Sequence, residues 1–201
     1  MLTGLETRRI RLREIEDKDL PILFHWRNSE KYRVLLHYNM ETISYEEFCK
    51  EFARDGEAFK YRFLAEKKEN NMPVGLTYVN LFSEQYRSCF INLFIDEPFE
   101  KKGYGLDAFL LFTLFLFKQA DLKKLFASVF DFNDHSISCI RNIGMRELVG
   151  NVTKVIRRGK EESLLCFAAE QSIVPRLEQI SSYLSASRQK IATQIHSSLT
   201  E

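Results

Sequence analysis

The sequence predicts an α/β (α+β) domain built around one central sheet. Seven short segments carry the alternation or the apolar run of a strand, and polar turns join most of them to their neighbours in sequence. Helical patterns interrupt the strands at two or three places. With 45% hydrophobic and 28% charged residues, the 201-residue chain has the composition of a folded globular protein.

The first strand is expected over 8–13, where Ile10 and Leu12 alternate with arginines. We interpret the arginine row as the solvent-facing side of a half-buried strand. The other six strands are bounded by polar, Gly or Pro residues, and they are expected over 61–66, 74–82, 88–95, 125–130, 151–156 and 164–168.

Four helices are expected among these strands. One starts at Asp17 and continues to Arg27, with a proline in its first turn. A second runs from Ser44 to Arg54, because Ser44 and Glu47 have the spacing of a capping box. The other two are expected over 105–118 and 134–142.

Charge and hydropathy exclude several kinds of partner. The 29 Lys+Arg residues nearly balance the 28 Asp+Glu residues, so the net charge of +1 gives no reason to expect a nucleic acid or an anionic membrane. The most apolar run, 108–117, is about half the roughly 20 residues that a membrane span needs, and it is predicted as a buried helix. No apolar stretch follows the arginine-rich N-terminus, so we expect a cytoplasmic protein.

The cysteines and histidines form no metal-binding or redox pattern. No CxxC pair and no HExxH motif occurs among the four residues of each type. We therefore expect reduced thiols, and we expect no metal ion.

The segment 171–201 differs in composition from the domain expected over 1–170. Apolar residues from Ile173 to Ile195 recur at spacings of three, four or seven, which is typical of an amphipathic helix. Ser172 is a candidate cap and Pro175 falls in the first turn. This C-terminal helical extension packs either on the domain or on a second subunit, so one expected arrangement is a homodimer.

A glycine-rich loop joins the strand 88–95 to the helix that follows it. Gly103 and Gly105 let the backbone approach a ligand closely, and the first amides of a helix attract anions. Lys101 and Lys102 add positive charge beside them. These features predict a phosphate or pyrophosphate site. Because no Lys-Ser/Thr pair follows Gly105, the loop is not that of a P-loop NTPase.

A second motif follows the strand 125–130. Asn133 and Ser136 open a short helix, which is followed by Gly144 and Met145. Taken with the loop 100–105, this segment resembles the GNAT superfamily of N-acetyltransferases, whose loop has the form Gln/Arg-x-x-Gly-x-Gly/Ala and whose later segment has the form Asn-x-x-Ser. Glu100 replaces the Gln or Arg of that pattern.

The resemblance covers roughly residues 5–168. It is closest to two groups: enzymes that acetylate protein N-termini, including those of ribosomal proteins, and enzymes that acetylate amino groups of nucleotide-activated sugars. Both groups begin with a strand like 5–13. The segments 25–29 and 43–48 are more similar to the sugar group.

The resemblance implies a mixed, mostly antiparallel sheet of about seven strands, flanked by helices and splayed apart at its centre. Acetyl-CoA would be the co-substrate, and its pantetheine arm would enter the splay. Asn133 would hydrogen-bond the arm and Ser136 would lie near its thiol. The remaining cofactor-binding residues implied are Leu93, Phe94 and Ile95 for the arm, and Lys101, Lys102, Gly103, Tyr104, Gly105 and Leu106 for the pyrophosphate.

The implied reaction is attack of a primary amine on the thioester, with coenzyme A leaving. Because an alkyl amine has a pKa of roughly 10, a base is useful, and the candidates are His37 and Asp96, with Asp131 and Glu84 behind them. All four side chains can accept a proton.

The acid that protonates the departing thiolate is less clearly marked. Ile140 stands where many family members have a tyrosine, so Ser136, Tyr38 or water is the candidate acid. We discount Cys139 as a nucleophile, because no base adjoins it in the sequence.

Two functions therefore stay open. The first is an N-acetyltransferase whose acceptor is an amino sugar, another small amine or a protein N-terminus. The second is a catalytically degenerate module that binds acyl-CoA or a partner, as Glu100 and Ile140 suggest. Phe94 and Phe132 are the expected walls of the acyl slot.

Overall fold

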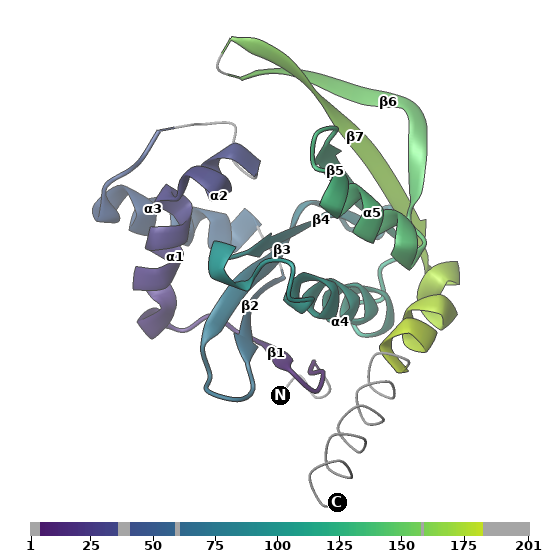
Figure 1. Ribbon diagram of the computed structural model, residues 1–201, viewed down its shortest axis with the longest axis horizontal. Coiled ribbons are helices and arrows are strands. Elements are labelled where there is room, and N and C mark those ends of the chain that lie inside the picture. The colour runs from purple at the N-terminus through teal and green to yellow at the C-terminus, as the bar shows by residue number, and fades with distance from the viewer. Residues whose placement is uncertain (1–4, 36–40, 59–60, 158, 183–201) are drawn as a thin grey trace, which may run out of the picture.

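The computed structural model describes residues 5–35, 41–58, 61–157 and 159–182. Seven strands form one sheet in the order β1-β2-β3-β4-β5-β7-β6 (Figure 1). Every neighbouring pair is antiparallel except β4 and β5. The strands are β1 Ile10–Arg13, β2 Arg62–Lys67, β3 Pro73–Ser83, β4 Ser88–Ile95, β5 Lys124–Phe130, β6 Arg146–Arg157 and β7 Lys160–Glu170.

Helices cover both faces of the sheet. On one face lie α1 (Leu20–Asn28), α2 (Glu30–Leu35) and α3 (Tyr45–Ala58), which pack with Leu64 of β2 and Phe94 of β4 in one apolar cluster. The other face carries α4 (Tyr104–Lys118) and α5 (Asp134–Ile143), and these two helices share the larger core. The mixed, mostly antiparallel seven-stranded sheet predicted from the sequence is confirmed.

The most apolar helix, α4, is buried along most of its length. Residues 107–113 and 115–117 are buried, which confirms the interpretation of this run as a core helix. Among the described residues, no helix is long and apolar enough to cross a membrane.

Two local predictions are confirmed at the level of side chains or boundaries, and a third is corrected. Ser44 precedes α3, where its N–H donates to Glu47 Oε2 at 2.9 Å and its Oγ accepts from the Glu47 N–H at 3.2 Å. The strand predicted over 88–95 has the same bounds as β4. The helix expected from Asp17 begins instead as a 3-10 turn, Asp17–Asp19, and becomes α-helical at Leu20.

The arginine row of the first strand is only partly solvent-facing: the Arg11 side chain is 43% exposed, but those of Arg9 and Arg13 are 21% and 17% exposed, so the interpretation was wrong for these two. Arg13 donates to both carboxylate oxygens of Asp19, at 2.7 and 2.8 Å, and its Nε donates to Glu66 at 2.6 Å. Arg11 also pairs with Glu66, whose carboxylate is almost fully buried. The alternation places these side chains opposite the core face, but acidic residues of β2 and of the 3-10 turn cover them.

The Arg13–Asp19 pair predicts a defined acid sensitivity. The Arg13 guanidinium, opposed by burial, lowers the pKa of Asp19 below its usual value. A carboxyl whose pKa is lower in the folded state stabilises the fold above about pH 4 and loses this contribution as the pH falls through its folded pKa. Asp19→Asn is therefore expected to cost about 2 kcal/mol at pH 7 and progressively less between pH 5 and pH 2.

Urea unfolding at a series of pH values measures this difference. The matched control is Glu69→Gln, which removes a carboxylate that is 79% exposed and pairs with Lys67. The prediction would be contradicted if the difference in unfolding free energy between the wild type and Asp19→Asn stayed constant down to pH 2.

The sheet has a weak seam at its centre. The parallel strands β4 and β5 pair only through Ser88 with Lys124, Cys89 with Leu125 and Phe90 with Phe126. Beyond Phe90 the two strands diverge, which is the splayed centre that the resemblance implied. The gap opens at the carboxyl ends of both strands.

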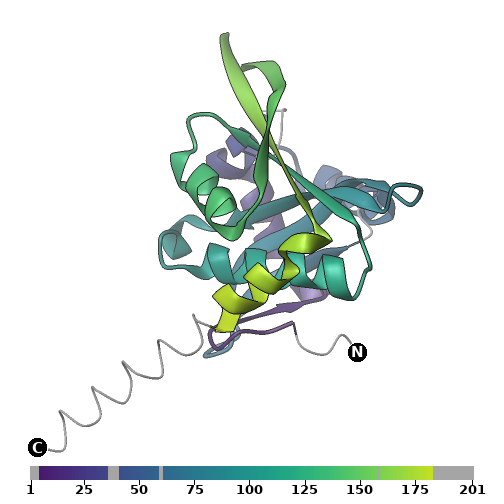
Figure 2. The same cartoon turned by 90° about the vertical axis from the view of Figure 1, so that its right-hand side faces the viewer.

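The first part of the C-terminal segment packs on the core of the domain. A 3-10 turn, Gln171–Ile173, leads into a helix over 174–182, drawn in yellow in Figure 2. Leu177 is fully buried, and Arg176 donates to the Asn142 carbonyl at 2.8 Å. Of the other predicted apolar positions of the amphipathic helix, Ile173 and Ile180 pack against the core, and Leu184, Ile191 and Ile195 lie outside the described residues.

Candidate active site

Alternation along β4 decides which backbone groups face the gap. The Asp96 N–H donates to the Val74 carbonyl at 2.9 Å, and hydrogen-bonded positions alternate along an antiparallel pair. Phe94 therefore directs its N–H and C=O toward β3. Leu93 and Ile95 direct theirs away from β3 and into the gap, and we call this segment, Leu93–Ile95, the open β4 edge.

Phe94 differs from the expectation for it in two respects. Its backbone pairs with β3, because the strand alternates, so it cannot also serve a ligand in the gap. Its ring is 2% exposed and lies among the helices of the α1–α3 face, 5.5 Å from the Trp26 ring and 5.1 Å from the Tyr32 ring. Phe94 is therefore a core residue of that face.

Phe132 lies beyond the carboxyl end of β5 and is half exposed. Its ring stacks on Phe130 at 5.1 Å, and the Arg157 guanidinium covers both rings. Arg157 also donates to the Val34 carbonyl, which ties β6 to α2. Phe132 thus lies beside the contact between Arg157 and Val34 that joins β6 to α2.

The glycine loop leads from β4 to the first turn of α4. Gly103 caps the helix with φ +80, and the amides of Tyr104, Gly105 and Leu106 form the first turn, where a helix leaves N–H groups free for an anion. A Cβ on Gly105 would lie 3.4 Å from the Ile95 side chain. The loop therefore lies directly against the open β4 edge.

Arg9 binds the carbonyl groups of this glycine loop. Its guanidinium donates to the carbonyls of Lys102 and Gly103 at 2.6 and 2.7 Å, and to the Asp107 carboxylate at 2.9 Å. Thr7 adds a hydrogen bond to Asp107 at 3.1 Å. Because the carbonyls are held on the Arg9 side, the loop amides are left to face outward.

The second motif lies at the carboxyl end of β5, beside the loop that follows β4. Asn133 caps α5 by accepting from the Ser136 N–H at 3.2 Å, so its Oδ1 is engaged and its amide group is the part left for a ligand. Ile140 is buried in the core and carries no acidic proton. Asn133 and Ser136 are both half-buried.

The candidate bases fall in different places. Asp96 directly follows β4 and caps the turn after it, accepting from the Glu97 N–H at 2.9 Å. Asp131 follows β5, at the same end of the sheet as Asp96. Glu84 lies in the β3–β4 turn at the opposite end of β4, too far to serve the site. His37 lies outside the described residues, as does Tyr38.

The thiols of Cys89, Cys139 and Cys166 do not offer a nucleophile, although His135 Nε2 lies 4.0 Å from Cys139 Sγ, where no adjoining base was expected. Burial raises the pKa of Cys89 to about 12, and it also raises the pKa of Cys139 and Cys166. A protonated thiol is a poor nucleophile at neutral pH. In the described part of the chain, no group of three or more His, Cys, Asp or Glu residues could hold a metal ion.

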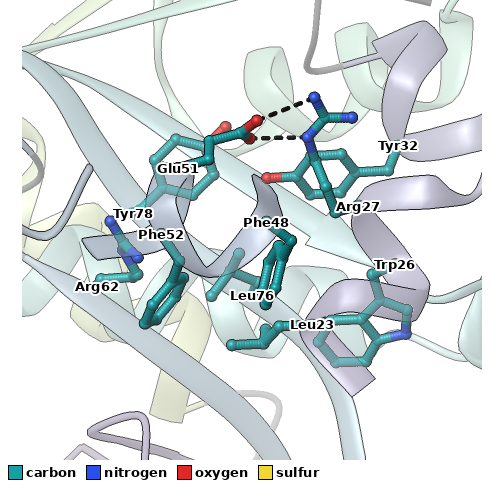
Figure 3. A pocket seen from close by; sticks show the side chains of 10 residues that line it. All are labelled: Leu23, Trp26, Arg27, Tyr32, Phe48, Glu51, Phe52, Arg62, Leu76 and Tyr78. Atoms are coloured by element: carbon teal, nitrogen blue, oxygen red, sulfur yellow. Dashed lines mark hydrogen bonds and ion pairs between the residues drawn. The ribbon is translucent and has the colours of Figure 1, made fainter. Parts of the chain in front are cut away.

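A small cavity of about 40 Å³ is lined by residues of α1, α2 and α3 and of strands β2 and β3 (Figure 3). Arg27 and Glu51 form a two-bonded ion pair at its edge, at 2.8 and 3.1 Å, which joins α1 to α3. Burial raises the pKa of Tyr32 to about 12, so its hydroxyl stays protonated. The full lining is Leu23, Trp26, Arg27, Tyr32, Phe48, Glu51, Phe52, Arg62, Leu76 and Tyr78.

Comparison with known proteins agrees with this geometry. A family model described as an acetyltransferase (GNAT) domain matches residues 9–146. The chain therefore belongs to the GNAT acetyltransferase family, and it is an acetyl-CoA-dependent N-acetyltransferase by class. No curated protein matches the sequence.

Solved structures share the fold at low sequence identity. A spermidine N-acetyltransferase from Vibrio cholerae, solved with CoA and spermine, has a TM-score of 0.74 and 18% identity, over 82% of this chain and 97% of that one. A GNAT-family acetyltransferase from Bacillus anthracis has a TM-score of 0.70 and 17% identity, over 84% and 98%. A candidate ribosomal-protein-serine acetyltransferase from Vibrio cholerae has a TM-score of 0.62 and 18% identity, over 83% and 96%.

Sequence reasoning missed two side chains at this site, Arg9 and Lys31. Arg9 was assigned to a solvated strand face, although its partners are 93 to 98 residues away. Lys31 lies on α2, a helix with no clear sequence signal, and it contacts Ile95. The one available hint was Glu100, an acidic residue where the family pattern has Gln or Arg.

Proposed function

We propose that this protein transfers the acetyl group of acetyl-CoA to a primary amine, which attacks the thioester directly in a ternary complex. The open β4 edge carries this proposal. Leu93 and Ile95 direct backbone groups into a gap that ends at the glycine loop. An extended amide-containing arm needs such an edge, and a pyrophosphate needs the free amides of a helix N-terminus.

The proposed chemistry assigns one task to each group. An N–H of the open β4 edge would polarise the thioester carbonyl as an oxyanion donor. His37 and Asp96 are the proposed bases that take the proton of the amine, and Ser136 is the proposed donor to the departing thiolate. His37→Ala or Asp96→Asn should lower kcat by roughly 100-fold and alter its pH profile if that residue is the base.

The acceptor is proposed to be an amino sugar or another small amine, or a protein N-terminus. Polyamines join the candidates, because the Vibrio cholerae spermidine N-acetyltransferase with this fold was solved with spermine. A panel of all three classes, with acetyl-CoA and a colorimetric measurement of released thiol, tests the proposal. Steady thiol release with one class is the expected result.

The alternative is a degenerate member of the family that binds acyl-CoA without turnover. Ligand binding to the native state raises the melting temperature according to RT ln(1 + [L]/Kd). A melting temperature raised by acetyl-CoA, with no thiol release across the panel, would favour the alternative. The absence of any shift at millimolar acetyl-CoA would contradict both functions.

Assembly and location are also proposals. The predicted helical extension beyond residue 182 is proposed to mediate a homodimer in the cytoplasm. Sedimentation velocity of the full chain, compared with a chain that ends at residue 182, measures its role; the cut retains Leu177, which belongs to the core. If the sedimentation coefficients of both chains are those expected for monomers, the dimer is excluded.

A further inference from the structure

One carbonyl of the open β4 edge already has a partner from outside the sheet. Lys31 Nζ, on α2, donates to the Ile95 carbonyl oxygen. The same ammonium pairs with the Glu100 carboxylate, at the start of the glycine loop, and lies 5.0 Å from the centre of the Phe94 ring. We call this arrangement the Lys31–Glu100 bridge.

The bridge lies where a bound arm would make a backbone contact. The Ile95 carbonyl points in the plane of the strand toward the gap, because Ile95 alternates with the positions paired to β3. A carbonyl accepts best near that plane, so an ammonium and an amide N–H approach it from the same direction. A hydrogen bond from a charged donor is roughly twice as strong as a neutral one. The Lys31 ammonium therefore competes with an amide N–H of the arm for the Ile95 carbonyl.

The surroundings hold the ammonium in place. The Lys31 side chain is 22% exposed and that of Glu100 is 41% exposed, so water screens the pair only in part. Glu100 is also the residue that departs from the Gln or Arg of the family pattern. A carboxylate at position 100 pairs with the Lys31 ammonium, whereas Gln would bind the ammonium weakly and Arg would repel it.

We infer that the Lys31–Glu100 bridge is a specificity-determining element of the donor site. The pantetheine arm binds by displacing Lys31 Nζ from the Ile95 carbonyl, so the bridge lowers the affinity for ligands that carry the arm. It does not act on the nucleotide phosphates, which bind the loop. The inference rests on the proposed binding of the arm along the open β4 edge.

A charge-neutral variant tests the inference. Lys31→Met with Glu100→Gln removes the bridge without changing the net charge, so the attraction of the site for anions is preserved. Calorimetric titration is done with two probes: CoA, which has the arm, and adenosine 3′,5′-bisphosphate, which lacks it. The double variant is expected to bind CoA about three- to tenfold more tightly and the bisphosphate equally well.

The matched control is Lys50→Met with Glu46→Gln, which removes an exposed pair of the same residue types on α3 and should change neither affinity. A second variant, Glu100→Gln alone, keeps Lys31 but loosens it, and should give a smaller gain for CoA. CoA affinity that is unchanged or weaker in the double variant would overturn the inference. Parallel changes for both probes would also overturn it, because they would indicate a general charge effect.

Failure of this inference and failure of the proposed function are distinguishable, because the titration needs no acceptor and no turnover. If the wild type transfers acetyl groups and the double variant binds CoA no tighter, only the inference falls. If the selective gain for CoA appears without transfer to any amine, the inference stands and the proposed activity falls.

Discussion

Replacing Arg9 with methionine is expected to lower the free energy of unfolding by about 3 kcal/mol and to weaken acetyl-CoA binding at least tenfold. The substitution leaves the Asp107 carboxylate, which is 5% exposed, buried without its cation. It also releases the carbonyls of Lys102 and Gly103, so the loop no longer holds its amides outward. Urea unfolding and calorimetric titration measure the two effects separately.

A double variant separates loop positioning from simple destabilisation. Asp107→Asn in the Arg9→Met background removes the unpaired charge while an amide oxygen remains for Thr7, so most of the lost stability should return. The affinity for acetyl-CoA should stay low, because the carbonyls of Lys102 and Gly103 remain without the Arg9 guanidinium. Recovery of both quantities together would contradict a positioning role. Arg8→Met, at an exposed neighbouring arginine, is the control and should change neither.

Replacing Gly75 with alanine is expected to destabilise the protein by roughly 2–4 kcal/mol. A Cβ on Gly75 would lie 2.2 Å from the Phe94 carbonyl oxygen and 2.8 Å from the Ile95 side chain, both on β4. Because the nearer atom belongs to the backbone, the strands themselves must separate. The displaced strand carries the open β4 edge, so acetyl-CoA affinity should fall as well.

The control for this prediction is Gly150→Ala in β6. No atom lies within 4 Å of a Cβ at that position, and its φ of +89 gives only a left-handed strain of roughly 1 kcal/mol. Thermal unfolding of the two variants distinguishes a steric conflict from conformational strain. A cost at Gly75 no larger than the cost at Gly150 would show that β3 adapts to the added methyl group.

Much of the fold could be predicted because its signals are local. The alternation and the turn residues around 88–95 mark β4 at its observed bounds, and the Ser44–Glu47 capping box lies within four residues of sequence. The glycine pair and the Asn-x-x-Ser motif indicated the candidate acetyl-CoA site for the same reason. Each of these features is formed by neighbours along the chain.

What could not be predicted depends on contacts between distant segments. Lys31 and Ile95 are 64 residues apart, and Arg9 and Asp107 are 98 apart, so no local pattern reveals that either pair exists. The start of β6 was also missed, since it pairs with β7 across a register shift between Glu147 and Val152. Most residues on both sides of that shift are exposed, so β6 lacks the alternation of buried and exposed residues that marks a strand in the sequence.

The weak seam between β4 and β5 also bears on how the enzyme is made. Strands β1 to β4 come entirely from the chain before the seam, and β5 to β7 entirely from the chain after it. During synthesis, the half that carries the glycine loop can therefore pair its own strands while β5 is still untranslated. The opposite wall of the gap between β4 and β5 is synthesised only afterwards, so the proposed acetyl-CoA site is completed late in the synthesis of the chain.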